Sequence, residues 1–164
     1  MEKTFLHESS RETWVVTEKV HGANYSLWYD GETLRAAKRT GWIEDDFWGH
    51  PDVMESYRSR IEAAYKLLTP SSSLVLYGEL CGGAYPGKEP SEQEERPVQK
   101  GIYYSPKYEF FLFDIVVDGV YLNHTQVVQI ADDLSFPIYA YILFIGSLQA
   151  CLEYSNVFNT TIPH

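Results

Sequence analysis

The stretch EKVHGAN, residues 18–24, joins two apolar segments near the N-terminus, and its lysine is the reference point for the rest of the chain. A lysine amine becomes a nucleophile at neutral pH only where burial or neighbouring cations lower its pKa. Lys19 is such a candidate, and Gly22 allows a tight turn and a close backbone approach to a phosphate. A Lys-x-x-Gly pattern also arises by chance, since glycine alone is about 7% of residues. The remaining sequence has to decide its meaning.

The composition is that of one globular domain. Of the 164 residues, 45% are hydrophobic and 15% aromatic, which is enough for a packed core. The formal net charge is −10, whereas nucleic-acid-binding proteins usually carry a basic surface. Any contact with nucleic acid therefore has to come from a local patch or from sequence outside this chain.

Neither the cysteines nor the apolar runs indicate a secreted or membrane protein. Cys81 and Cys151 are too few and too far apart for a disulfide framework or a metal-ligand cluster, so we expect reduced thiols. The longest apolar run, residues 136–145, is shorter than the roughly 20 residues that span a bilayer. The polar N-terminus does not lead into a signal-peptide core. We expect a soluble intracellular protein with no membrane partner, in a compartment that the sequence leaves open.

The spacing of apolar residues predicts an α+β fold. Val53, Tyr57 and Ile61 recur at helical spacing after Pro51, which predicts a helix over residues 51–68. Further helices are predicted over 123–134, capped by Asn123, and over 147–154, and strands over 13–17, 24–29, 34–39, 74–80, 108–117 and 138–144. Because strand hairpins alternate with isolated helices, antiparallel sheets flanked by helices are favoured over a regular parallel α/β fold.

Two connecting segments are unusual in composition. Residues 82–107 are long, polar and rich in glycine and proline, which predicts a mobile surface loop. The segment 42–50 combines aromatic and acidic residues. Its rings could stack on nucleic-acid bases, but core packing is the favoured interpretation. Its Asp45-Asp46 pair is more typical of a solvated loop than of a metal site, so no metal ligand is assigned.

Four segments occur in an order that resembles the RNA ligase 2 family of ATP-dependent RNA ligases, which includes the kinetoplastid RNA-editing ligases. They are EKVHGAN (18–24), AKRTG (37–41), YGELCGG (77–83) and FFLFDI (110–115), and the stretch QKGIYYSP (99–106) is also similar to the family. The resemblance runs from about Trp14 to the end of the chain. It implies the covalent nucleotidyltransferase fold, which agrees with the predicted antiparallel sheets and flanking helices.

The resemblance also implies a reaction, substrates and cofactors. Lys19 matches the lysine that attacks the α-phosphorus of ATP and forms a lysyl-AMP intermediate, in a reaction that uses Mg²⁺ or Mn²⁺. The AMP then passes to the 5′-phosphate of a nicked or broken RNA strand, and a 3′-hydroxyl displaces it. His21 stands where DNA ligases and capping enzymes commonly have aspartate. In related RNA ligases this position matters more for sealing than for adenylylation.

Five further residues match nucleotide-binding positions of the family. Glu18 lies at the adenine edge and Asn24 contacts the nucleotide, while Arg39 suits phosphate or ribose oxygens. Glu79 matches the glutamate that accepts a hydrogen bond from the ribose, and Phe113 matches the aromatic residue that stacks on adenine. Without the resemblance, Phe113 would be interpreted as a core residue, His21 as a turn residue and Arg39 as a surface residue. Glu79 is harder to explain that way, because an unpaired carboxylate in an apolar strand is costly.

The chain departs from the family pattern at both ends. The family continues to a Glu-Gly-x-Val strand that helps hold the metal and to a Lys-x-Lys pair that neutralises the phosphates, and it has a further segment before the position of Trp14. Residues 1–164 are therefore expected to be the N-terminal part of a single adenylyltransferase domain, with the rest on a missing segment or a partner chain. Two alternatives stay open: a non-catalytic nucleotide- or RNA-binding remnant, and a DNA ligase or capping guanylyltransferase of the same superfamily.

We therefore predict that this chain alone transfers AMP poorly. Losing cationic groups beside the α-phosphate removes transition-state stabilisation of about 3 kcal/mol per contact, or hundreds-fold in rate. The measurement is incubation with α-labelled ATP and Mg²⁺, followed by denaturing electrophoresis. Robust covalent label on Lys19 would contradict the prediction.

Overall fold

The computed structural model describes residues 12–45, 47–70, 72–83 and 96–162 of the chain. These residues form two compact units. The smaller unit comprises Met1–Lys19 and Tyr141–Thr161, and the larger unit comprises Val20–Ala140 and Ile162–His164, in both cases for the described residues. The boundary therefore falls directly after the predicted nucleophile. No helix among the described residues is long and apolar enough to cross a membrane.

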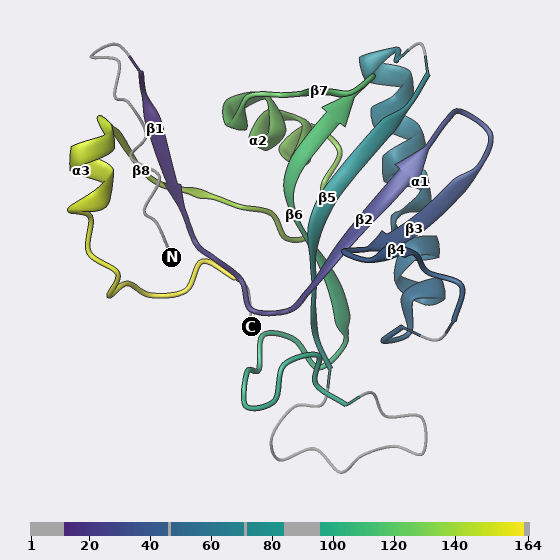
Figure 1. The fold of residues 1–164 in the computed structure, drawn as a ribbon, viewed down its shortest axis with the longest axis horizontal. Helices are drawn as coiled ribbons and strands as arrows, with labels where there is room; N and C mark the ends of the chain where they lie inside the picture. The colour runs from purple at the N-terminus through teal and green to yellow at the C-terminus, as the bar shows by residue number, and fades with distance from the viewer. Residues whose placement is uncertain (1–11, 46, 71, 84–95, 163–164) are drawn as a thin grey trace. The chain divides into compact units, whose positions relative to one another are not determined.

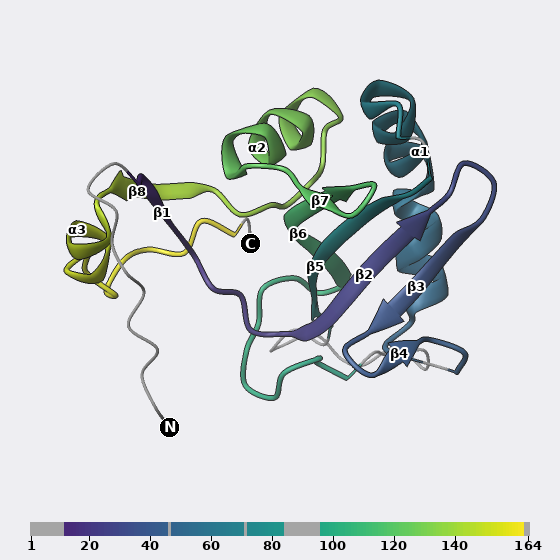
Figure 2. The same cartoon turned by 45° about the horizontal axis from the view of Figure 1, so that its top comes forward.

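The larger unit is built on a six-stranded antiparallel sheet (Figure 1). In the order of their pairing, the strands are β4 (Gly41–Trp42), β3 (Leu34–Lys38), β2 (Ala23–Tyr29), β5 (Leu74–Gly82), β6 (Tyr108–Val117) and β7 (Val120–Tyr121). Figure 2 shows the β2–β3 hairpin with β4 at its outer edge. Asp30 makes this hairpin turn, because its Oδ1 accepts hydrogen bonds from the amides of Thr33 and Glu32 at 2.8 and 2.9 Å. These bonds hold the pKa of Asp30 below its ordinary value.

Two helices bury their apolar faces in the main core. Helix α1 (His50–Leu68) carries the predicted buried positions Val53, Tyr57 and Ile61. Helix α2 (His124–Asp133) begins with a capping box in which Asn123 and Gln126 satisfy each other's backbone amides. The apolar residues of both helices join the same cluster as alternate residues of the central strands, which together form one core.

A tyrosine links helix α1 to the middle of the sheet. The Tyr57 hydroxyl donates to the carbonyl oxygen of Phe110 at 3.1 Å, and the two rings pack edge to face with centroids 5.3 Å apart. Burial raises the pKa of Tyr57, so the hydroxyl keeps its proton and remains a donor. One side of the sheet is thus closed by helix packing and by satisfied hydrogen bonds.

The smaller unit is a two-stranded antiparallel sheet with one short helix. Strand β1 (Trp14–Thr17) pairs with β8 (Ile142–Gly146), with Val15 opposite Ile145. Helix α3 (Leu148–Leu152) follows, and the Ser147 side chain caps its N-terminus by accepting from the amide of Ala150 at 3.2 Å. The Cys151 thiol lies 3.6 Å from the carbonyl oxygen of Trp14 and links α3 to β1.

The predicted α+β class and most predicted elements are confirmed. The strand predicted over 138–144 is wrong in its position, because the two halves of this apolar run pair with different strands. Its first part lies beside β6, with the Ala140 amide donating to the Leu112 carbonyl at 2.9 Å, and only Ile142–Gly146 forms a strand, with β1. Helix α3 is shorter than predicted, and strands β4 and β7 were not predicted. Of the predicted loop 82–107, residues 84–95 lie outside the described residues.

We predict that Gly78→Ala destabilises the larger unit. A Cβ at this position in β5 would lie 2.2 Å from a ring carbon of Phe110 and 2.4 Å from the carbonyl oxygen of Phe111. Overpacking of this kind costs about 2–3 kcal/mol of unfolding free energy. Gly119→Ala is the control, because no atom of the described residues lies within 4 Å of its Cβ and only its positive φ of 82° costs about 1 kcal/mol. Urea denaturation measures both; equal losses would contradict the packing argument.

Candidate functional site

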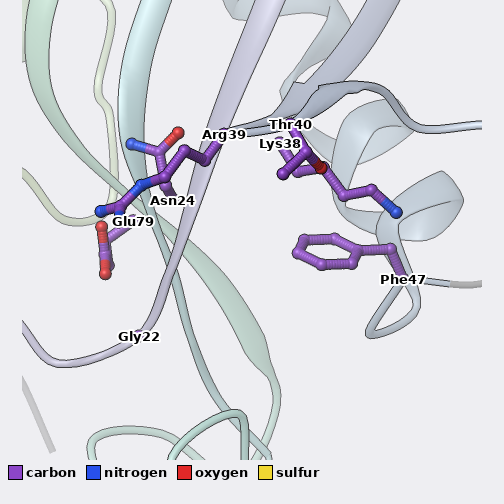
Figure 3. A pocket seen from close by; sticks show the side chains of 7 residues that line it. All are labelled: Gly22, Asn24, Lys38, Arg39, Thr40, Phe47 and Glu79. Carbon is purple, nitrogen blue, oxygen red and sulfur yellow. The ribbon is translucent and has the colours of Figure 1, made fainter.

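A cavity of about 350 Å³ lies at the open end of the β2–β3 hairpin, away from its turn, within the larger unit (Figure 3). It is lined by Gly22, Asn24, Lys38, Arg39, Thr40, Phe47 and Glu79. Four of these are residues that the sequence analysis assigned to nucleotide binding, namely Gly22, Asn24, Arg39 and Glu79. They come from three separate segments of the chain, of which the first and the last are more than fifty residues apart.

Strand register brings the four residues together. Asn24 and Glu79 are direct partners in the β2–β5 ladder, so their side chains lie next to each other on the same face of the sheet. Tyr25 pairs with Lys38 at the end of β3, and Arg39 and Thr40 form the turn into β4. This turn places the Arg39 side chain in the lining of the cavity.

Gly22 lies so close to strand β5 that no side chain fits there. A Cβ on Gly22 would lie 2.2 Å from the carbonyl oxygen of Leu80 and 2.7 Å from Cγ of Glu79. The Gly22 carbonyl oxygen in turn accepts a hydrogen bond from Nε2 of Gln99 at 2.9 Å. The glycine of the opening motif is therefore required by its approach to the neighbouring strand, which brings the backbone over the Glu79 side chain.

The charged groups of the cavity are divided between two sides. Figure 3 shows the Arg39 guanidinium directed toward Asn24 and Glu79, with Lys38 and Phe47 on the opposite side. Lys38 Nζ lies 3.3 Å from the Asp45 carboxylate and 5.3 Å from the centre of the Phe47 ring. A guanidinium can bind phosphate oxygens in a fork, and a carboxylate can accept hydrogen bonds from hydroxyl groups. The cavity thus offers complementary groups for a phosphate and a sugar.

Two predicted site residues belong to the smaller unit. Glu18 is buried, and its carboxylate accepts three hydrogen bonds, from Thr160 Oγ1 at 2.6 Å and from the amide and Oγ1 of Thr161 at 2.7 and 2.8 Å. These bonds fix Glu18 to a segment 142 residues further along the chain. Lys19 is the next residue and is exposed, and the chain continues through Val20 and His21 to Gly22.

The two remaining predicted residues do not line the cavity. His21 is exposed, and its backbone amide donates to the Tyr104 hydroxyl at 3.3 Å. Phe113 lies at the irregular step of the β5–β6 ladder, where Tyr77 pairs with Asp114 but Gly78 pairs with Leu112. Its half-buried ring packs against a second, smaller core made of Val20, Cys81, Phe111, Ile138, Ala140 and Ile162.

Lys38, Thr40 and Phe47 line the cavity but were not predicted from the sequence to be site residues. Lys38 and Thr40 flank Arg39 in the quoted AKRTG segment, so their positions were a signal that could have been used. Phe47 belongs to the aromatic segment 42–50, for which core packing was favoured. That interpretation is confirmed for Ile43, Phe47 and Trp48, which pack against the main core, although Phe47 also borders the cavity. It is wrong for Trp42, which is exposed at the edge strand β4.

The described residues do not form a metal site by themselves. Among them, no group of three or more histidine, cysteine, aspartate or glutamate side chains is placed to hold a metal ion. No metal ligand was predicted in the Asp45-Asp46 pair. The second residue of this pair, number 46, lies outside the described residues.

Known relatives were found by sequence. Mitochondrial RNA-editing ligase 1 of Trypanosoma brucei brucei is 30% identical over 196 residues, which cover 96% of this chain and 42% of that protein. Mitochondrial RNA-editing ligase 2 of the same organism is 28% identical over 183 residues, which cover 93% of this chain and 44% of that protein. The chain therefore spans less than half the length of these relatives.

Solved structures share the fold. The Naegleria gruberi RNA ligase with PPi aligns with a TM-score of 0.57 and 18% identity, over 83% of this chain and 37% of that one. A variant of that ligase with ATP and Mn aligns with a TM-score of 0.56 and 16% identity, over 90% of this chain and 45% of that one.

The family model described as RNA ligase matches residues 12–161, which is nearly the whole chain. The match includes the strands that form the cavity and the threonines that hold Glu18. The chain therefore belongs to the RNA ligase family.

Proposed function

We propose that this chain is the nucleotide-binding part of an ATP-dependent RNA ligase that joins nicked or broken RNA strands. The observation that carries the proposal is the cavity in which Gly22, Asn24, Arg39 and Glu79 meet. Family membership supports the same reaction, since the matching relatives are named RNA-editing ligases. Neither observation favours the DNA ligase or capping alternatives.

In the proposed first step, the unprotonated Nζ of Lys19 attacks the α-phosphorus of ATP. A P–N bond forms, the bond to the bridging oxygen of pyrophosphate breaks, and the amine proton is released. An RNA 5′-phosphate oxygen then attacks the same phosphorus, the P–N bond breaks, and the lysine nitrogen takes up a proton as it leaves. Finally a 3′-hydroxyl attacks the RNA 5′-phosphorus, loses its proton and expels AMP. Each displacement requires the attacking atom to be held in line with the leaving group.

Different residues of the cavity bind different parts of the nucleotide. Arg39 binds phosphate oxygens with its guanidinium, and Glu79 accepts a hydrogen bond from a ribose hydroxyl. Asn24, beside Glu79 in the strand ladder, has an amide that can both donate and accept. Gly22 lets the backbone lie close against β5, which leaves room for the phosphates.

The residues outside the cavity have supporting roles in the proposal. The three hydrogen bonds on Glu18 hold the residue directly before Lys19 to Thr160 and Thr161 within the smaller unit. Phe113 stacks on the adenine, and His21 acts in sealing. A divalent ion, Mg²⁺ or Mn²⁺, neutralises phosphate charge in such reactions. The described residues do not form a site for this ion, and no step here depends on their binding it.

We predict that Arg39→Ala weakens ATP binding about tenfold. Removing a charge-assisted hydrogen bond costs roughly 1.5–3 kcal/mol, and about 1.4 kcal/mol is a factor of ten in affinity. Isothermal titration calorimetry with ATP and Mg²⁺ measures the change. Arg35→Ala is the matched control, because Arg35 lies on β3, just before the turn that carries Arg39, and is also exposed, but it is not among the described residues that line the cavity. If both variants lose affinity equally, the cavity is not the nucleotide site.

We predict that any covalent label taken from α-labelled ATP resides on Lys19. Peptide mass spectrometry should place AMP on Lys19, and Lys19→Arg should lose the label while it still binds ATP. Lys38→Arg is the control, since Lys38 is the lysine that lines the cavity among the described residues. Label that survives Lys19→Arg and disappears in Lys38→Arg would overturn the assignment. ATP binding with no label on either lysine would favour the non-catalytic remnant.

A further inference from the structure

A second cavity adjoins the nucleotide cavity on the face of the sheet opposite the main core. Its volume is about 390 Å³, and its walls include Asn24, Lys38 and Arg39, which the two cavities share. The rest of its lining is different in kind, because it contains the rings of Trp28, Trp42 and Tyr77. All of these residues belong to the larger unit.

The rings belong to a continuous aromatic row, defined here as Trp42, Trp28, Tyr77 and Tyr121. Successive ring centroids are 5.5, 6.2 and 6.2 Å apart. The row crosses the sheet from β4 through β2 and β5 to β7. Trp28 and Tyr77 alternate with the core-facing residues of their strands, so the row lies on the face opposite the main core.

Much of the aromatic row is open to solvent. Trp42 is 41% exposed and Tyr121 is 63% exposed, whereas the largest rings of the core face, Tyr25 and Phe110, are fully buried. Exposed apolar surface arranged in a line rather than scattered indicates a binding surface. The rings are also set at different angles, so they offer both faces and edges to a ligand.

Cations flank the Trp42 end of the row, and one carboxylate lies further along it. The Arg35 guanidinium carbon lies 4.0 Å from the centre of the Trp42 ring, and Lys38 and Arg39 line the same cavity as the rings. Asp114 is opposite Tyr77 in the strand ladder, and burial raises its pKa. Positive charge is therefore concentrated where the row meets the nucleotide cavity.

We propose that the aromatic row binds an unpaired segment of the RNA strand whose 5′-phosphate receives AMP. Bases stack on aromatic rings regardless of sequence, and guanidinium and ammonium groups pair with the backbone phosphates. The formal charge of −10 makes a local cationic patch necessary for such binding. The shared wall of Asn24, Lys38 and Arg39 lets the strand end enter the nucleotide cavity directly. The inference rests on the proposed function.

The test uses a fluorescent oligouridine of about 12 nucleotides with a 5′-phosphate, a length within the usual range of single-strand sites. Fluorescence anisotropy should show that Trp42→Ala binds it about tenfold more weakly, since one stacked base contributes roughly 1–3 kcal/mol. Trp42→Tyr should restore most of the affinity. Tyr103→Ala is the matched control, because Tyr103 is also 41% exposed but lies outside the row.

The salt dependence separates charge from stacking. Arg35→Ala should weaken binding and make the log–log salt slope shallower by about 0.7, the value for one phosphate contact on a single strand. Trp42→Ala should leave that slope unchanged. ATP affinity should stay within about twofold in both variants, a change of roughly 0.4 kcal/mol, because neither residue lines the nucleotide cavity.

The outcomes distinguish this inference from the proposed function. RNA binding unaffected by both Trp42→Ala and Arg35→Ala, or weakened equally by Tyr103→Ala, overturns the inference even if ATP binds. Row-dependent RNA binding with no ATP binding supports the inference and overturns the nucleotide site. Self-association that Trp42→Ala abolishes, together with unchanged RNA binding, shows that a second copy occupies the row and overturns the inference.

Discussion

The pairing of β2 with β5 is the constraint on which the candidate site depends. It sets Asn24 beside Glu79, and it is possible only because Gly22, just before β2, has no side chain. A Cβ there would lie 2.2 Å from the Leu80 carbonyl oxygen, so the two strands would have to separate or change register. Because side chains alternate, a one-residue slip would turn Glu79 into the core and bring Leu80 to the cavity. The close approach of the Gly22 backbone to β5 therefore maintains both the strand pairing and the arrangement of the cavity residues.

The same sheet serves two purposes because its faces are used differently. Leu74, Leu76 and Leu80 of β5 bury themselves with α1 and α2, while Tyr77 and Glu79, the residues between them, face the cavities. The main core is thus stabilised on the side of the helices, where the Tyr57 hydroxyl is hydrogen-bonded and the apolar faces of the helices are buried. The other side can carry a carboxylate, a guanidinium and exposed rings without weakening the main core. The two cavities share Asn24, Lys38 and Arg39, so the proposed nucleotide site and the proposed strand site form one surface.

Local sequence patterns predicted most elements but not their long-range partners. Helix α1 was predicted to within one residue, because Val53, Tyr57 and Ile61 repeat at helical spacing after Pro51. The apolar run 138–144 has no such internal signal for where it changes partner, so its division between β6 and β1 was missed. In the site, Phe47 was missed for a similar reason. Its place at the cavity depends on how the segment after β3 folds back, not on a local motif. Lys38, in contrast, ends β3 and adjoins Arg39 in a quoted motif.

The sequence by itself determined the order of the elements, the α+β class and the motifs that mark an RNA ligase, because periodicity and motif spacing are properties of the chain alone. The tertiary structure decided which residues share a cavity, which threonines hold Glu18 from 142 residues away and which rings form a row. These features arise from strand register and from packing between distant segments. Both are set by the free energy of the whole fold, so no local stretch encodes them.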